Sequence, residues 1–315
     1  MGILSNKQIT DNSVSDSSKL SGHMYVLAAY TLFGLMIPFS KDAINAGVSG
    51  TGFVACRLIG ATVLFWLASL FVKTQKIDPK DLLSLILMSF FGMGSGMYLV
   101  IVGTSLTSPV HGSIIITTAP LFTLCFAFIF KSEKLSFRKI TGVISACIGA
   151  VILGLQAASG SNGSSVTGDL MILSAQFTFA VYLTFFVRLM RKYDSFTLNR
   201  WLFLFSSIMF LPLTAGGLAD IPWQNLSPKT CFETLYIVVV CSFVTFILLL
   251  NGQKRVSPVI AGIYMYVQPV VGIAAAVFLG IGVFGIYQAA AVILVIGGIV
   301  LATFRKNSAA VMPEK

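Results

Sequence analysis

Charged residues are scarce in this sequence: Asp, Glu, Lys and Arg together make up 10% of its 315 residues. It has two histidines, His23 and His111, and no paired carboxylates, H-E-x-x-H helix, nucleophile elbow or phosphate-binding glycine loop. The residue sets that acid–base, hydrolytic or metal-assisted catalysis needs are therefore missing. We expect no enzyme activity, no catalytic residues, no metal site and no cofactor.

Cysteine is also sparse, and its five copies are scattered singly without a C-x-x-C pair, mostly inside apolar runs. This pattern is typical of small apolar side chains in membrane helices, not of disulfides or metal ligands. The formal net charge of +10 would suit a nucleic-acid partner, but the basic residues fall in short connections between apolar runs. That placement is typical of a membrane topology signal, and we expect no nucleic-acid partner.

What the sequence has in abundance is apolar residues, at 56% of the chain with a mean hydropathy of +0.90, which is a membrane composition. They gather in segments of roughly 20 residues, each long enough to cross about 30 Å of hydrocarbon. We therefore expect an all-α polytopic membrane protein. Its ten expected transmembrane helices are 24–43, 53–72, 82–102, 108–130, 138–157, 168–187, 198–216, 231–250, 257–280 and 286–304.

The basic residues predict how these segments cross the membrane. Of the 21 Lys and Arg residues, only Lys41, Arg57 and Lys229 fall on one side when the connections are assigned alternately. Because Lys and Arg favour the cytoplasmic side, both termini are expected in the cytoplasm. The polar first 22 residues have no hydrophobic run of the kind found in signal peptides, and we expect a disordered cytoplasmic tail. The expected location is the cell (inner) membrane, as a multi-pass protein in contact with lipid.

The chain contains an internal duplication. The stretch SPVHGSIIITTAPLFTLCFAFIFKSE from Ser108 returns as SPVIAGIYMYVQPVVGIAAAVFLGIG from Ser257, 149 positions later. Because each half has an odd number of segments, the second half enters the membrane from the opposite side, which makes a five-plus-five inverted repeat. The expected parts are a tail at 1–22, a first repeat at 23–157, a flexible Gly/Ser linker at 158–167, a second repeat at 168–305 and a cytoplasmic tail at 306–315.

Pro120 and Pro269 occupy matching places near the middle of the fourth and ninth segments. Proline has no N–H to donate along the helix, so we expect both helices to kink or loosen. In hydrocarbon such a break must be covered by protein or line a cavity, and paired breaks in two halves are typical of a transport site. We therefore expect both prolines to be gate residues.

Ten segments, the five-plus-five repeat and the S-P…P segment followed by EKLSFRKITGVISACIGAVILGL resemble the drug/metabolite transporter (DMT) superfamily, in its EamA-like branch. The resemblance covers nearly the whole chain. It implies a carrier of small metabolites, often amino acids or related compounds, which it often moves outward, with alternating access to a central cavity. We expect an exporter or exchanger of small polar metabolites. The alternatives are an intramembrane enzyme and a membrane scaffold or receptor, and a homodimer is left open.

Helical spacing places polar side chains together on several segments. In the first segment Tyr30, Gly34, Ile37 and Lys41 follow one stripe. Polar side chains at mid-depth can replace the water that a polar substrate loses; alternatively, they only bond neighbouring helices. The candidate substrate-binding residues are Tyr30, Tyr98, His111, Thr118, Gln176, Tyr264 and Gln268, whereas Tyr266, about 200° round the helix from Tyr264, is expected to pack or to face lipid.

Three cationic or titratable residues, Lys41, Arg57 and His111, fall in the expected outer third of the membrane. Together they would make a positively charged vestibule. The alternatives are that Asp42 neutralises Arg57 or Lys41, that Lys41 extends to the lipid headgroups, and that His111 is a hydrogen-bonded packing residue.

Overall fold

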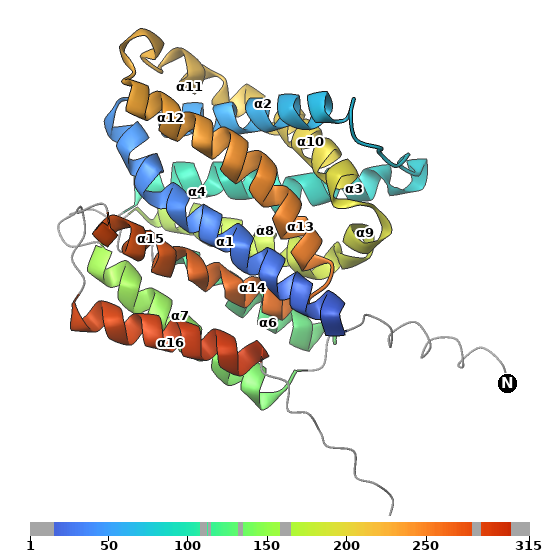
Figure 1. Cartoon of the computed structure of the whole chain (residues 1–315), viewed down its shortest axis with the longest axis vertical. Helices are drawn as coiled ribbons and strands as arrows, with labels where there is room; N and C mark the ends of the chain where they lie inside the picture. Colours follow the sequence, from blue (N-terminus) through green and yellow to red (C-terminus); the bar gives the residue numbers. More distant parts are fainter. Residues whose placement is uncertain are drawn as a thin grey trace, which may run out of the picture.

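The computed structural model describes residues 16–107, 112, 115–131, 135–157, 165–278 and 285–303. All regular secondary structure within these ranges is helical, and the helices pack side by side in one bundle (Figure 1). Their ends follow ordinary capping rules. Ser49, Ser165, Asp194 and Ser227 each accept a hydrogen bond from a backbone N–H three residues on. They thereby start α2 (Gly50–Ala68), α8 (Val166–Phe185), α10 (Ser195–Thr214) and α12 (Pro228–Tyr236).

Among the described residues, eight helices are long and apolar enough to cross a membrane. They are Leu20–Asn45, Gly50–Ala68, Pro79–Leu106, Val166–Phe185, Ser195–Thr214, Pro228–Gln253, Pro258–Ala275 and Ile286–Thr303. Each coincides with an expected segment, and the first belongs to α1 (Asp16–Asn45), which begins seven residues before the expected first repeat. The fourth and fifth segments hold α6 (Ala119–Ile129), an apolar helix of 11 residues, and α7 (Phe137–Ala157). The prediction of an all-helical, multi-pass membrane protein is confirmed.

Two of the spans contain a turn of π-helix that the sequence analysis did not predict. The span of the third expected segment, Pro79–Leu106, contains α3 (Leu82–Ser89), η2 (Phe90–Gly94) and α4 (Ser95–Leu106). The span of the eighth expected segment, Pro228–Gln253, consists of α12, η4 (Ile237–Val244) and α13 (Thr245–Gln253). Ser95 and Ser242 each donate a side-chain hydrogen bond to the carbonyl five residues earlier. The serine hydroxyls thus add a second donor to carbonyls inside the π-turns, and the carbonyl of Phe90 also accepts from the backbone N–H of Ser95.

The fourth and ninth segments are interrupted, but not at the prolines themselves. Thr117 and Thr118 form a turn before α6, and η5 (Tyr264–Tyr266) separates α14 (Pro258–Ile263) from α15 (Val267–Phe278). Pro120 and Pro269 lie within the first three residues of the helices that follow. A missing N–H costs little there, because the first turn of a helix has no internal acceptor for it.

α7 and α16 (Ile286–Thr303) lie side by side along one edge of the bundle (Figure 1). Their backbones touch through glycine: a Cβ on Gly142 would lie 2.6 Å from the carbonyl oxygen of Gly298, and one on Gly149 would lie 2.6 Å from that of Ala291. Any larger side chain would have to push the two helices apart, so glycine is what allows this approach.

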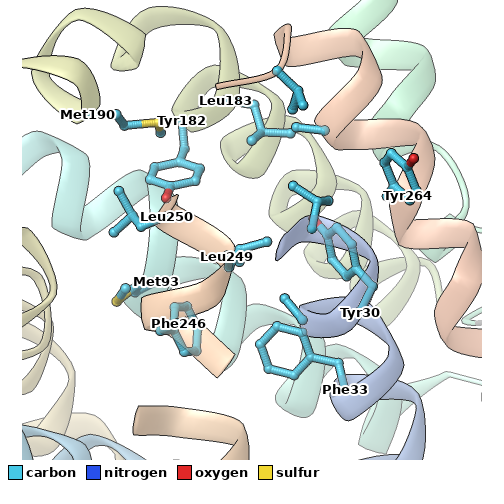
Figure 2. Close-up of a cluster of buried hydrophobic side chains, with 14 of the residues drawn as sticks. Tyr30, Phe33, Met93, Tyr182, Leu183, Met190, Phe246, Leu249, Leu250 and Tyr264 are labelled. Atoms are coloured by element: carbon cyan, nitrogen blue, oxygen red, sulfur yellow. The ribbon is translucent and has the colours of Figure 1, made fainter. Parts of the chain in front are cut away.

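The centre of the bundle is filled by aromatic and aliphatic side chains (Figure 2). Tyr30 and Phe33 come from α1, Tyr182 from α8 and Phe246 from α13, and all four are buried. The rings of Phe33 and Phe246 meet edge to face, with centroids 5.5 Å apart. This core joins helices from both ends of the chain, and the polar groups of the candidate site are embedded in it.

Candidate functional site

The polar stripe of the first span faces the ninth span. A Cβ on Gly34 would lie 2.6 Å from Cβ of Val271 and 2.9 Å from the carbonyl oxygen of Gln268, and one on Gly272 would lie 2.8 Å from Cδ1 of Ile37. The stripe is therefore packed tightly against α15. Lys41, its last member, lies in α1, but its side chain lies outside the described part of the structure.

Two predicted residues of the ninth segment differ in how their polar groups are used. Tyr264 is buried, and its hydroxyl lies 3.0 Å from Nδ1 of His23, near the start of α1. Gln268 is half-buried, and its amide makes no hydrogen bond to a described residue. The hydroxyl of Tyr264 thus links η5 to α1, whereas the amide of Gln268 is free to bind a ligand. Sequence reasoning missed His23, which it placed next to the tail.

Tyr30 and Tyr182, two of the buried residues in Figure 2, differ in the hydrogen bonding of their hydroxyls. The Tyr182 hydroxyl donates a 2.8 Å hydrogen bond to Oε1 of Gln253. The Tyr30 hydroxyl and Nε2 of Gln253 are buried without a partner among the described residues. A buried polar group left unpaired costs about 1–3 kcal/mol, so these groups are suited to receive a polar ligand. Gln253 was also missed, because it stands beyond the expected end of the eighth segment.

The surroundings of the other predicted binding residues differ from one residue to the next. Gln176 is buried in α8 and makes no hydrogen bond within the described chain. Tyr98 in α4 packs its ring against Phe210, with centroids 6.0 Å apart. The Thr118 hydroxyl donates to the carbonyl of Ile115 at 2.7 Å and is satisfied locally. His111 lies outside the described residues.

Arg57 and Asp42 do not pair. Nζ of Lys229 lies 2.6 Å from Oδ2 of Asp42 and 3.6 Å from Oε1 of Glu233. Arg57 is 7% exposed and donates from Nε to the hydroxyl of Ser242 at 2.9 Å. The alternative that Asp42 neutralises Arg57 is therefore wrong: Asp42 is bound to Lys229.

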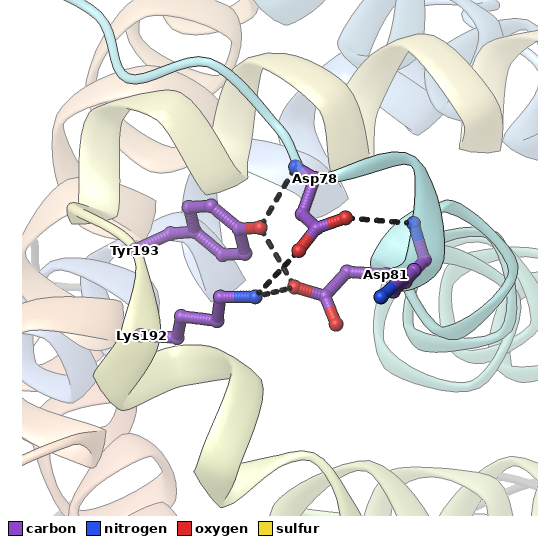
Figure 3. Close-up of polar contacts among 5 residues, drawn as sticks. Asp78, Asp81, Lys192 and Tyr193 are labelled. Atoms are coloured by element: carbon purple, nitrogen blue, oxygen red, sulfur yellow. Dashed lines mark hydrogen bonds and ion pairs between the residues drawn. The ribbon is translucent and has the colours of Figure 1, made fainter.

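A second polar cluster ties the two halves together at the opposite end of the bundle (Figure 3). Lys192 of α9 (Val187–Lys192) pairs with Asp81 and lies 3.6 Å from Asp78, while the Tyr193 hydroxyl donates to Asp81 at 2.7 Å. The hydrogen bond to the Asp81 carboxylate raises the pKa of Lys192 above its ordinary value. These contacts anchor the start of the third span to the second half.

A cavity of about 580 Å³ lies beside this cluster. It is lined by Thr74, Gln75, Lys76, Ile77, Pro79, Leu82, Arg200 and Trp201. Of the described residues predicted to bind substrate, none lines this cavity. Three of them, Tyr30, Gln176 and Tyr264, are buried instead between helices of the bundle.

Membrane-length helices packed around buried polar groups define the class of the protein as a multi-pass helical membrane protein. The EamA-like transporter family matches residues 20–155 and, a second time, residues 166–304. The chain belongs to this family, as the resemblance at the sequence level predicted.

Curated relatives agree with that assignment. The chain is 26% identical to the uncharacterized transporter YdfC of Bacillus subtilis over 67% of this chain and 68% of the relative. It is 25% identical to an uncharacterized transporter of Archaeoglobus fulgidus over 61% and 66%, and 24% identical to the uncharacterized transporter YxxF of Bacillus subtilis over 95% of both. A solved crystal structure shares the fold with a TM-score of 0.72, at 18% identity, over 91% of this chain and 98% of the other. Family and relatives point to transport and not to an enzyme.

Proposed function

We propose that this protein is a secondary transporter that exports or exchanges small polar metabolites, such as amino acids, by alternating access. The central cavity would lie between two inverted repeats of five spans each. The observation that carries the proposal is a set of close helix contacts that pair the two halves in a two-fold manner. In known carriers of this kind, such halves move against each other around a fixed site.

The contacts between α7 and α16 support this two-fold relation. Gly142 meets Gly298 and Gly149 meets Ala291. Gly142 and Ala291 are repeat mates 149 positions apart, and so are Gly149 and Gly298. Exchanging the two halves therefore turns each contact into the other. The two separate matches of the family along the chain also support a duplication.

A second pair of contacts supports it independently. A Cβ on Gly103 would lie 2.9 Å from the carbonyl oxygen of Gly168, where the third span crosses the sixth. One on Gly252 would lie 3.0 Å from the carbonyl oxygen of Gly22, where the eighth crosses the first. The third and eighth spans hold corresponding places in the two halves, as do the first and sixth. The same crossing is therefore built twice.

The substrate class is supported by the chemistry of buried polar side chains with spare hydrogen-bonding capacity. Gln176, Tyr30 and Gln253 are each at most 4% exposed, and they offer amides and hydroxyls without fixed charge. Groups of this kind replace the hydration shell of a polar solute when it enters an apolar interior. The proposed location is the inner membrane, with both termini in the cytoplasm, as the positive-inside rule predicts.

Transport is tested with the purified chain in proteoliposomes loaded with a mixed metabolite panel, followed by the appearance of labelled panel members on the other side. We expect saturable exchange of at least one polar metabolite above the level of protein-free liposomes. Absence of flux for every panel member, together with tight binding of a protein partner, would favour the scaffold alternative.

Orientation is tested separately in a cysteine-free background. We expect a cysteine replacing Lys229, whose side chain is 72% exposed, to react with a membrane-impermeant reagent added to intact cells. A cysteine replacing the exposed Lys76, at the opposite end, should react only after the cells are opened. Reaction at Lys76 in intact cells would reverse the proposed topology.

A further inference from the structure

Arg57 is a buried cation that has no counter-ion among the described residues. It lies in α2 and is 7% exposed. Its single hydrogen bond in this part of the chain runs from Nε to the hydroxyl of Ser242, which is itself fully buried. A guanidinium stays protonated at physiological pH. Keeping an unpaired charge inside a membrane protein is strongly unfavourable, and ionisable groups in such places usually mark a site with a specific partner.

Asp42 and Glu233, two carboxylates at this end of the bundle, lie near Lys229 and not against Arg57. Asp42, near the end of α1, and Glu233, in α12, both contact Lys229, at 2.6 and 3.6 Å. Both helices reach the same end of the bundle as the start of α2 (Figure 1). Neither of these two carboxylates makes an ion pair with Arg57 among the described residues. An anion that pairs with this guanidinium would therefore come from outside the described chain.

The guanidinium is also held in a definite orientation. Ser242 lies in η4, and its hydroxyl donates to the carbonyl of Ile237 while it accepts from Arg57. Fixing Nε in this way leaves the two terminal nitrogens as donors, and their planar fork matches the two oxygens of a carboxylate. π-helical turns are frequently found at functional sites.

Arg200 in α10 offers a comparison, because the sequence Phe196-x-x-x-Arg200 repeats Phe53-x-x-x-Arg57 of α2. Its guanidinium lies 4.8 Å from the ring centroid of Trp66 and 5.6 Å from that of Trp201, and it donates to the Thr74 hydroxyl. Aromatic rings stabilise a cation without an anion. Arg57 has no such ring contact among the described residues, so it lacks the stabilisation that the two rings give Arg200.

We propose that Arg57 binds the carboxylate group of the transported metabolite, on the side of the membrane assigned to the outside. The substrates are therefore metabolites that carry a carboxylate, either zwitterionic or acidic. This inference rests on the proposed function, because it assigns the substrate class of that same transporter. The amides and hydroxyls described above would then contact the remainder of the solute.

Binding is tested without transport, using acetate as the smallest carboxylate probe and acetamide as its neutral counterpart. The purified full chain is titrated with each in chloride-free buffer while its unfolding temperature is recorded. We expect a saturable rise with acetate and none with acetamide. Arg57→Gln should raise the acetate dissociation constant at least tenfold, whereas the matched variant Arg200→Gln should leave it unchanged.

Two milder variants keep the test decisive if Arg57→Gln does not fold. Arg57→Lys keeps the charge but loses the planar fork, and we expect it to weaken acetate binding about tenfold. Ser242→Ala removes the hydrogen bond that orients the guanidinium and should weaken acetate binding by a smaller factor. An acetate response that is equal in the wild type and both Arg57 variants would overturn the proposal, as would a response lost only in Arg200→Gln.

A transport experiment separates this inference from the function it rests on. Proteoliposomes are loaded with a mixture of amino acids and the corresponding amino acid amides. We expect the wild type to release the amino acids but not their amides. The amino acid flux should fall at least tenfold in Arg57→Gln. Efflux of the amides at equal rates would overturn the carboxylate site while leaving a transporter. Absence of all flux, with intact acetate binding at Arg57, would instead contradict the proposed function.

Discussion

The hydroxyl of Tyr266 donates a 2.8 Å hydrogen bond to the carbonyl oxygen of Thr117, a residue 149 positions away. That separation is the offset of the sequence repeat, so the two residues are repeat mates. Thr117 begins the turn that interrupts the fourth segment, and Tyr266 is the last residue of η5 in the ninth. Each interruption therefore touches the other, and the side chain at one satisfies a backbone group released at the other. The two breaks form a single structural unit.

Tyr266→Phe removes only this hydroxyl. The Thr117 carbonyl would keep a long contact of 3.9 Å with Sγ of Cys147, and we expect unfolding to become easier by about 1 kcal/mol. Tyr287→Phe is the matched control, because Tyr287 is 65% exposed. Thermal unfolding of both variants in the same detergent checks the prediction. Equal unfolding temperatures in the two would show that the bond contributes nothing.

Two neighbouring glycines of α16 should respond in opposite ways to alanine. A Cβ on Gly298 would lie 2.5 Å from the carbonyl oxygen of Gly142, whereas one on Gly297 meets nothing within 4 Å. We expect Gly298→Ala to destabilise the protein by about 1–3 kcal/mol through overpacking. Gly297→Ala should be neutral or stabilise by up to about 1 kcal/mol, through its higher helix propensity. The measurement is the free energy of unfolding of both variants in denaturant. Equal changes in the two would contradict the α7–α16 contact.

The sequence was sufficient for those features that depend on composition and period. Apolar length located the spans, and the repeat of Ser108 and Ser257 placed glycines such as Gly149 and Gly298 in corresponding positions. These glycines turned out to face the partner helix, which follows physically because two helix backbones can touch only where a side chain is missing.

What the sequence could not predict depends on which side chains meet across the bundle. Asp42 could have paired with Lys41, Arg57 or Lys229, and only the fold selects Lys229. The bond between Tyr264 and His23 joins residues 241 positions apart and has no local signal. The π-turns likewise have no residue signature of their own. The prolines indicated interruptions correctly, but the break lies upstream, since proline fits the first turn of a helix.

Tyr264 and Gln268 should affect substrate affinity to different degrees. The Tyr264 hydroxyl already has a partner in His23, whereas the Gln268 amide has none among the described residues. We expect Gln268→Ala to weaken substrate binding by about 1–3 kcal/mol, which is roughly 5- to 150-fold. Tyr264→Phe should act mainly on stability, and His23→Ala should reproduce its effect. Exchange rates and unfolding temperatures measured on the same preparations distinguish the two roles. Normal affinity in Gln268→Ala would remove the ninth span from the site.

The last prediction concerns Pro120 and Pro269, which we expect to act as hinges of two gates. Each follows an interruption closely, at Thr117–Thr118 and at Tyr264–Tyr266. Alanine at either position would remove the proline ring and let the helix continue through its break. The restored N–H gains an acceptor only when the helix closes in this way, which would then add about 1 kcal/mol of stability. A straighter helix should also slow the exchange between inward-open and outward-open forms.

The proposed inverted symmetry predicts in which direction each variant shifts the equilibrium between the two open forms. Corresponding hinges in inverted halves face opposite sides of the membrane, so Pro120→Ala and Pro269→Ala should favour opposite open forms, and the double variant should lie between them. The measurement is the labelling rate of a single cysteine at Gln176, using an impermeant reagent applied to each side of sealed vesicles. Pro212→Ala, a proline inside α10, is the control and should stabilise the protein without changing either rate. Shifts in the same direction for both hinge variants, or no shift in either, would contradict paired hinges and leave the prolines a role in static packing.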